Sequence, residues 1–222
     1  MKLAIFDFDG TLLMKDTLPC LGREWRRQNR SLSRFLKVYV SIAPWLLAYK
    51  AKTVSRERMK YEAVNRFIHI FKDMLRDEVN EFFAQAYGNI RACFNPLVLE
   101  EIKTARKEGF HLVLLSGAFH ELLHMVRHDL HFDSVIAAPL PFKDNYFDHT
   151  QEMELIDGKT KVILLQKFFS TAEVDWKRSR SFGDSYSDHY VMEMVGEPVA
   201  VNPDPDLLRL ARERNWRIIN NS

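Results

Sequence analysis

Short apolar runs alternate with longer amphipathic stretches over most of the chain, and this pattern predicts strands and helices in turn. We predict a first strand near the N-terminus, later strands over 110–115, 134–138, 179–183, 198–201 and 217–219, and helices over 95–108, 118–130, 159–170, 187–195 and 206–215. Residues 142–154 predict a short hairpin or loop around Asp144 and Asn145. Strand and helix in repetition indicate an α/β fold with a parallel sheet.

The chain from residue 16 to residue 88 differs from the rest. It contains two glycines, Gly22 and Gly88, and its pattern favours helices throughout. We therefore predict a core made of residues 1–15 and 89–222, which is interrupted once by an all-helical insert of residues 16–88.

The composition is that of an ordinary globular protein. Of the 222 residues, 46% are hydrophobic and 28% are charged, which provides enough apolar material for one core. Cys20 and Cys93 lie far apart and form no metal-binding or redox pattern, so we expect free thiols in a reducing compartment. The first strand begins almost at Met1, so we expect no signal peptide and a cytoplasmic protein.

Two carboxylates follow the first apolar run. Asp7 and Asp9 stand two residues apart where this strand opens into a loop. Alternate residues of a strand point to the same side, so both side chains can converge on one reacting centre. Like charges this close need a cation between them or a proton on one of them. The pattern indicates a metal site, a proton-transfer role or both; the other interpretation is a pair of helix-capping or turn acids.

Three further groups follow in order along the chain. Ser116 and Gly117 end the second long apolar strand, Lys161 precedes an apolar helix, and Asp184 and Asp188 come after a later strand. The carboxyl ends of parallel strands form the edge at which α/β sheets bind ligands, so we expect these side chains to share one site. Ser116 and Gly117 also fit an ordinary strand-to-helix turn, and Asp188 also fits a residue that only supports the metal ligands.

Taken in this order, the motifs resemble those of a known family of phosphatases. The chain is similar to haloacid dehalogenase (HAD) superfamily phosphatases of subfamily IB, which include phosphoserine phosphatase, and the resemblance continues through Val199–Asp204. It implies a Rossmann-like parallel sheet core with an inserted helical cap. It also implies a phosphoric monoester hydrolase that acts on a small phosphorylated metabolite, such as phosphoserine, through an aspartyl-phosphate intermediate.

The resemblance gives the acids their roles. Asp7 corresponds to the nucleophile that accepts the phosphoryl group, and Asp9 to the acid that protonates the leaving oxygen and later activates water. Asp7, the carbonyl of Asp9, Asp184 and Asp188 correspond to the residues around a Mg²⁺ ion. Carboxylate and carbonyl oxygens are the ligands that Mg²⁺ prefers, so the residue types agree with this cofactor.

The resemblance also implies a binding site for the transferred phosphoryl group. Ser116, Gly117 and Lys161 correspond to the residues that hold its oxygens. Lys159 and Lys167 lie close to Lys161 in the sequence, and surface lysines are common. The lysine of the family stands directly before the apolar helix, which favours Lys161.

Two cap residues bear on the substrate. Asp16 stands nine residues after the nucleophile, where phosphoserine phosphatases carry a glutamate that recognises an amino group. Arg66 corresponds to an arginine that binds the carboxylate of the substrate. Because Asp16 departs from the glutamate of the family, the sequence leaves open whether the substrate is phosphoserine or another phosphorylated compound.

The first part of the cap is strongly basic. Residues 23–60 carry eleven Lys and Arg against two acids, a local charge of +9 in a chain of net charge +2. An apolar, aromatic stretch over 35–49 lies between these cations and predicts either a segment that lies on an anionic membrane or a cap-core helix with cationic ends. The first interpretation suggests a phosphatidylglycerophosphate-type lipid headgroup phosphatase at the inner face of the membrane, or a non-catalytic binding protein. We expect no nucleic acid partner.

One motif points to different chemistry. Residues 120–124 match HExxH, the zinc-protease helix pattern, and His128 and His131 follow. This interpretation leaves the four aspartates unexplained. The alternative is a histidine-rich, partly exposed helix beside the predicted site.

Overall fold

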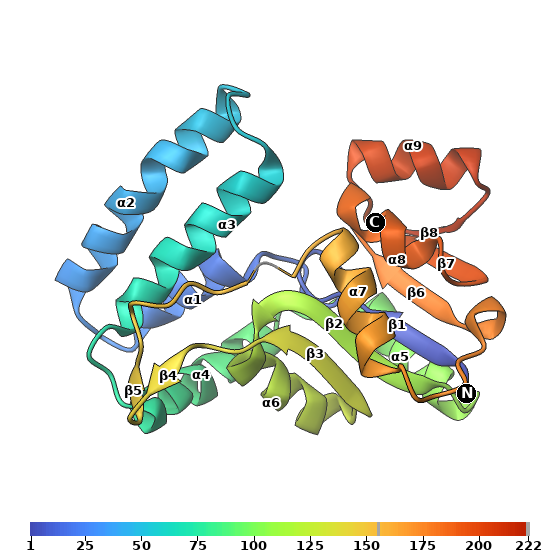
Figure 1. Cartoon of the computed structure of the whole chain (residues 1–222), viewed down its shortest axis with the longest axis horizontal. Coiled ribbons are helices and arrows are strands. Elements are labelled where there is room, and N and C mark those ends of the chain that lie inside the picture. Colours follow the sequence, from blue (N-terminus) through green and yellow to red (C-terminus); the bar gives the residue numbers. More distant parts are fainter. Residues whose placement is uncertain (155, 221–222) are drawn as a thin grey trace.

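A six-stranded parallel sheet forms the centre of the computed structural model, which describes residues 1–154 and 156–220 (Figure 1). The strands lie in the order β3-β2-β1-β6-β7-β8. Their bounds are β1 Leu3–Phe6, β2 His111–Phe119, β3 Ser134–Ala138, β6 Arg180–Gly183, β7 Glu197–Val201 and β8 Arg217–Ile219. Residues 155, 221 and 222, which belong to the predicted core, lie outside the described residues.

β1 lies inside the sheet because its side chains are apolar in both directions. All four of its residues are buried, which is typical of parallel strands covered on both faces. Phe6 stacks on Phe182 of the adjacent β6, with the ring centroids 4.3 Å apart. β1 pairs in parallel with β2 on one side and with β6 on the other. The predicted α/β fold with a parallel sheet is confirmed.

Helices flank this sheet (Figure 1). They are α5 Pro96–Lys107, α6 His120–Leu130, α7 Lys159–Phe168, α8 His189–Met192 and α9 Pro205–Glu213. Two of them begin with the same sequence signal, a capping side chain followed by proline. The side chain of Asn95 accepts from the Leu97 N–H at the start of α5, and that of Asp204 accepts from the Leu207 N–H at the start of α9.

The predicted cap segment is helical in the structure. It contains α1 Thr17–Arg27, α2 Leu32–Lys50, α3 Arg56–Phe67, the 3₁₀ helix η1 Ile68–Phe71 and α4 Arg76–Arg91. α2 and α3 pack side by side and stand away from the sheet, whereas α4 packs against α6 (Figure 1). Aromatic contacts such as Phe83 with Phe119 join this segment to the sheet. The division into two domains at residues 16 and 88 stays a prediction.

Three elements can be compared with their predicted bounds: the hairpin, β2 and α8. The predicted hairpin is present, with β4 Phe142–Lys143 paired to β5 Tyr146–Phe147. β2 runs on to Phe119 instead of ending at residue 115, because it pairs again with β3 after an irregularity. α8 is much shorter than the predicted helix over 187–195, since a 3₁₀ turn, η3 Tyr186–Asp188, precedes it.

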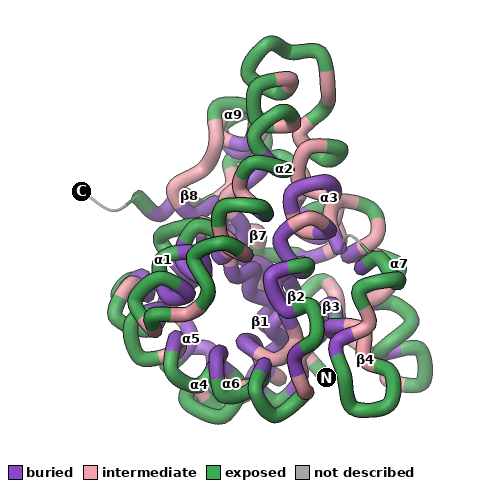
Figure 2. The backbone as a smooth tube through the Cα atoms, turned by 90° about the vertical axis from the view of Figure 1, so that its left-hand side faces the viewer, coloured by how far each residue is buried: buried purple, intermediate pink, exposed green. Residues whose placement is uncertain are grey.

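Burial is uneven between the two parts of the chain. Figure 2 shows buried residues along the strands, whereas α2 is exposed over much of its length. Within the described residues, none of the helices combines the length and the apolar character needed to cross a membrane.

Candidate active site

The carboxyl ends of β1, β2 and β6 meet at one edge of the sheet. Asp7 follows β1 directly, and Asp184 follows β6 directly. Phe6 pairs with Leu114 of β2 and with Phe182 of β6, so β1 and β6 end at nearly the same level, beside the part of β2 that leads to Ser116. This is the edge at which open α/β sheets bind ligands.

A buried lysine joins two of the predicted carboxylates. Lys161 Nζ lies 2.6 Å from Asp7 Oδ1 and 2.7 Å from Asp188 Oδ1. Burial alone would lower the pKa of Lys161, but the charges and hydrogen bonds of Asp188 and Asp7 outweigh burial and raise it. Lys161 is therefore a permanent cation beside Asp7. The two other candidate lysines, Lys159 and Lys167, are exposed on α7.

Three carboxylates surround one point at this edge. One oxygen each of Asp7, Asp184 and Asp188 lie within 4.8 Å of one another. Burial, followed by the charges of Asp7 and Asp188, raises the pKa of Asp184 to about 8. Burial also raises the pKa of Asp7 to about 6, against the opposing charge of Lys161. A single lysine cannot neutralise three carboxylates, so the cluster suits a divalent cation, and its oxygen donors fit Mg²⁺.

The loop after β1 requires glycine at position 10. Gly10 has φ of +78°, in the left-handed region, and a Cβ atom there would lie 2.2 Å from the Asp184 carboxylate. The hydroxyl of the next residue, Thr11, donates to Asp184 Oδ1 at 3.5 Å. Because Gly10 has no side chain, the loop after β1 can lie directly against Asp184, the acid that follows β6.

Asp9 is hydrogen-bonded to the first cap helix. Its Oδ1 accepts hydrogen bonds from the Thr17 backbone N–H at 2.9 Å and from the Thr17 hydroxyl at 2.5 Å. Burial raises the pKa of Asp9 to about 7; the Thr17 bond opposes this rise, and the charges of Asp7 and Asp16 add to it. A carboxyl group with a pKa near neutrality is suited to both donating and accepting a proton.

Ser116 and Gly117 reach the same edge from β2. Ser116 is buried, and its hydroxyl accepts from the Ala118 N–H at 3.2 Å. Gly117 is closely packed, because a Cβ atom there would lie 2.8 Å from the carbonyl oxygen of Ile156. Our expectation that the strand ends at these residues is wrong, since β2 continues through them to Phe119.

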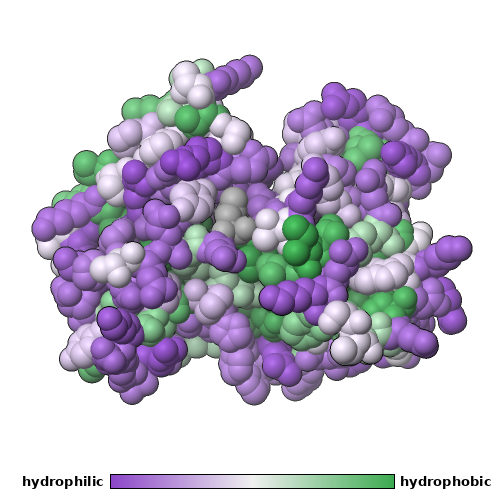
Figure 3. Space-filling model, in the orientation of Figure 1, coloured by the Kyte–Doolittle hydropathy of each residue, from purple (hydrophilic) through white to green (hydrophobic). Residues whose placement is uncertain are grey.

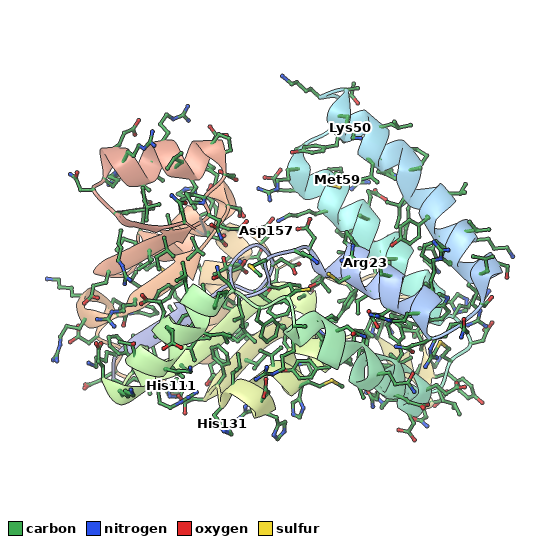
Figure 4. The ribbon with its side chains drawn as sticks, turned by 180° about the vertical axis from the view of Figure 1, so that it is seen from behind. Arg23, Lys50, Met59, His111, His131 and Asp157 are labelled. Carbon is green, nitrogen blue, oxygen red and sulfur yellow. The ribbon has the colours of Figure 1, made fainter. Side chains whose placement is uncertain are left out.

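Two cations of α3 lie over the edge of the sheet, and no sequence motif predicted a role for them in the site. Arg56 binds Asp204 at 3.0 Å, and Lys60 binds Asp157 at 3.2 Å. Asp157 lies between the cap and the sheet (Figure 4). The charge of Arg56 lowers the pKa of Asp184, and that of Lys60 lowers the pKa of Asp9, although burial dominates at both acids. Their spacing of four residues on one helix is the only sequence signal for this pair.

The two substrate-binding residues predicted in the cap have different surroundings. Asp16 is exposed at the start of α1, and its charge acts on Asp9. Arg66 instead pairs with Glu62 on its own helix and lies over the Trp45 ring, 5.0 Å from its centroid. The described contacts of Arg66 are therefore within the cap.

The HExxH pattern does not form a zinc site in the described part of the chain. The only described group of acids, histidines and cysteines arranged for a metal is that of Asp7, Asp184 and Asp188. Glu121 instead accepts from the Leu140 N–H at 3.2 Å. His124 is exposed on α6, as expected for a histidine-rich surface helix.

Comparison with known proteins agrees with this arrangement of strand ends. Residues 4–193 match haloacid dehalogenase-like hydrolases. The chain belongs to this family. It is 20% identical to the phosphoserine phosphatase of Methanocaldococcus jannaschii over 93% of this chain and 88% of that protein. It is 28% identical to phosphoserine phosphatase SerB1 of Mycobacterium tuberculosis over 50% of this chain, and the match spans 36% of that longer protein.

The fold of this HAD hydrolase also agrees with that of solved structures. A protein of unknown function from Bordetella pertussis Tohama I superimposes with a TM-score of 0.82 at 18% identity. The match covers 98% of this chain and 97% of that one. The predicted resemblance and the HAD-type fold are therefore confirmed.

Proposed function

We propose that the protein is a Mg²⁺-dependent phosphomonoester hydrolase that forms an aspartyl phosphate on Asp7. The main support is the buried Lys161, which holds Asp7 and Asp188 at 2.6 and 2.7 Å beside the acid of β6. A carboxylate attacks a phosphate dianion only when the repulsion between them is relieved. Lys161 supplies one positive charge; Asp7, Asp184 and Asp188 would hold a Mg²⁺ ion, which would supply the remaining positive charge.

In the first step, Asp7 attacks phosphorus and the bond to the leaving oxygen breaks. Asp9 gives its proton to that oxygen, so the leaving group departs as a neutral alcohol. Ser116, the backbone at Gly117 and Lys161 hold the equatorial oxygens, over which the negative charge is spread.

In the second step, Asp9 acts in the opposite direction. As a carboxylate it takes a proton from water, and the resulting hydroxide attacks phosphorus, which releases inorganic phosphate and restores Asp7. The cap of residues 16–88 covers the site during transfer and limits the entry of water. The bond between Asp9 and Thr17 supports this role, since it ties the acid of the core to the first cap helix.

The pH dependence of turnover tests the role of Asp9. The pKa of Asp9 is about 7, so the general acid loses its proton and the rate falls as the pH rises through that value. Thr17→Val removes a hydrogen bond that lowers this pKa, so the alkaline limb is expected at higher pH. Asp16→Asn removes a charge that raises it, so the limb is expected at lower pH. The measurement is the pH profile of kcat/KM, and limbs that fail to move in opposite directions contradict the assignment.

The first candidate substrate is a small phosphorylated metabolite such as phosphoserine. The similarity to phosphoserine phosphatases supports it. The charged residues proposed to bind polar groups that are not transferred all belong to the cap: Arg56, Lys60, Asp16 and Arg66. The three cations pair with carboxylates in the free protein, so binding would exchange these partners for groups of the substrate.

A lipid headgroup phosphate is the second candidate, because α2 exposes several large apolar residues. A screen of phosphoserine against phosphatidylglycerophosphate in detergent micelles separates the two candidates.

The reaction class is tested by hydrolysis of a generic aryl phosphate with Mg²⁺ and then with excess EDTA. Phosphate release that requires Mg²⁺ supports the proposal. Equal release in EDTA contradicts the metal assignment. No turnover of aryl phosphate, phosphoserine or lipid phosphate would favour a non-catalytic binding protein.

A further inference from the structure

The outer face of α2 is an apolar stripe with no cover. Leu32, Leu36, Val40 and Leu47 are 57%, 52%, 70% and 66% exposed. With Ala43, which is also exposed, they follow steps of four, four, three and four residues and so lie on one side of the helix. Figure 3 shows hydrophobic side chains along the outer edge of the molecule, where α2 lies.

The opposite side of α2 already has its partners. Val38 and Ile42 are buried, and α2 packs against α3 through this side. The Trp45 ring lies under the guanidinium groups of Arg58 and Arg66 of α3. The helix therefore has one face in the core of the cap and a second apolar face, roughly 28 Å long for its 19 residues, that meets solvent.

The border of this apolar stripe is cationic. Lys37 and Lys50 are exposed on α2, and Lys52 follows it; Lys50 lies near the far tip of the α2–α3 pair (Figure 4). α2 contains no acidic residue. None of these three lysines pairs with a carboxylate among the residues that the structure describes. The surface thus presents apolar side chains between unpaired positive charges.

We propose that this face of α2 docks on an anionic membrane surface, with the helix parallel to the bilayer plane. Apolar side chains would enter the boundary between headgroups and acyl chains, and the lysines would bind the anionic headgroups. A second copy of the chain fits less well, because it would place one segment of local charge +9 against another. The docking surface is separate from the catalytic acids, and its test does not depend on the proposed reaction.

The proposal is tested by sedimentation of the whole protein with vesicles at low salt. Vesicles of equal parts phosphatidylcholine and phosphatidylglycerol are expected to bind it, and pure phosphatidylcholine vesicles to bind it far less. Val40→Ser with Leu47→Ser is expected to weaken binding at least about tenfold, because two apolar anchors are lost. Lys37→Gln and Lys50→Gln are each expected to weaken it about fivefold, and high salt to abolish it.

A matched control uses exposed apolar residues elsewhere. Leu97 and Phe168 are 43% and 53% exposed on α5 and α7. Leu97→Ser with Phe168→Ser is expected to bind vesicles as the unmodified protein does. An unchanged thermal midpoint of the α2 variant shows that it is folded, and Asp7→Asn is expected to bind vesicles normally even if the proposed reaction is wrong.

Three outcomes would overturn the docking proposal. The first is no binding of the unmodified protein to anionic vesicles at low salt. The second is equal binding by the α2 variant. The third is a dimer in sedimentation velocity that Val40→Ser with Leu47→Ser converts to monomer, because the face would then be an interface between copies.

Discussion

Asp7→Asn is expected to lower kcat for aryl phosphate hydrolysis at least about a thousandfold, because the amide that replaces the carboxylate is a very weak nucleophile. The substitution keeps the size of the side chain and removes one of the three carboxylates that crowd the site. Burial and the charge of Asp188 raise the pKa of Asp7 to about 6 despite Lys161, so its ionised form is already costly to bury. The thermal midpoint without metal is therefore expected to be retained.

The control for this substitution is an acid outside the site. Asp206 is exposed on α9, so Asp206→Asn is expected to keep full activity. If Asp7→Asn turns over at a rate near that of the unmodified protein, Asp7 is not the nucleophile. If it unfolds, the loss of turnover carries no information on catalysis, and thermal melting in the same buffer distinguishes the cases.

Lys161→Met is expected to have the second largest effect, and it changes both stability and activity. Removing one partner of a buried ion pair leaves uncompensated charge, which typically costs about 3 kcal/mol or more in the free energy of unfolding. Asp7 and Asp188 both lose their hydrogen-bonded cation. Activity is expected to fall at least about a hundredfold, because one positive charge that stabilises the transition state is lost.

The loss of stability in Lys161→Met has a defined pH dependence. The folded-state pKa of Asp7 is raised to about 6, so below pH 6 this acid is largely neutral. Loss of the lysine charge then costs less free energy of unfolding than it does when Asp7 is ionised. The difference in unfolding free energy between variant and unmodified protein is therefore expected to grow as the pH rises from 5 to 8, and to shrink when Mg²⁺ is added.

The matched control is Lys167→Met, which replaces an exposed lysine of the same helix. It is expected to change the unfolding free energy by less than about 0.5 kcal/mol. Equal denaturant curves for both lysine variants would contradict the role of Lys161 as the buried counter-charge.

The sequence predicted the sheet and the acidic cluster at its edge because both depend on local signals. β1 is fully apolar and is followed by two acids, which predicts a buried strand with carboxylates at its end. The strands of the sheet are parallel, so Asp184 after β6 comes to the same edge. The metal-type cluster of Asp7, Asp184 and Asp188 follows from this rule. The preference for Lys161 came from the family resemblance, and the burial of its side chain could not be read from the sequence.

Contacts between cap and core could not be predicted from the sequence. They join residues far apart in the chain, such as Arg56 with Asp204 and Lys60 with Asp157, and depend on how α3 sits over the sheet. Arg66 was a candidate for substrate binding because of its place in the family pattern. Arg66 stands four residues after Glu62 on the same helix, and the two side chains form an ion pair. The family pattern does not take this local ion pair into account.

The environment of the apolar stretch over 35–49 also could not be predicted from the sequence. Its composition left two interpretations, a helix of the cap core and a segment that lies on a membrane. The structure gives α2 one buried side, as the cap-core interpretation expects, and one exposed apolar side, for which contact with a membrane stays a prediction. Composition alone could not divide the apolar residues between two faces, because that division depends on where α3 packs.

If Asp7 carries the phosphoryl group during turnover, the phosphorylated enzyme can be trapped and identified. The most direct measurement is acid quenching of the protein during hydrolysis of a phosphate-labelled substrate, followed by mass spectrometry of its peptides. We expect a phosphorylated peptide whose modified residue is Asp7, formed in Mg²⁺ and absent in EDTA and in Asp7→Asn. Rapid turnover with label on another residue, or with no labelled enzyme under any quench condition, would contradict it.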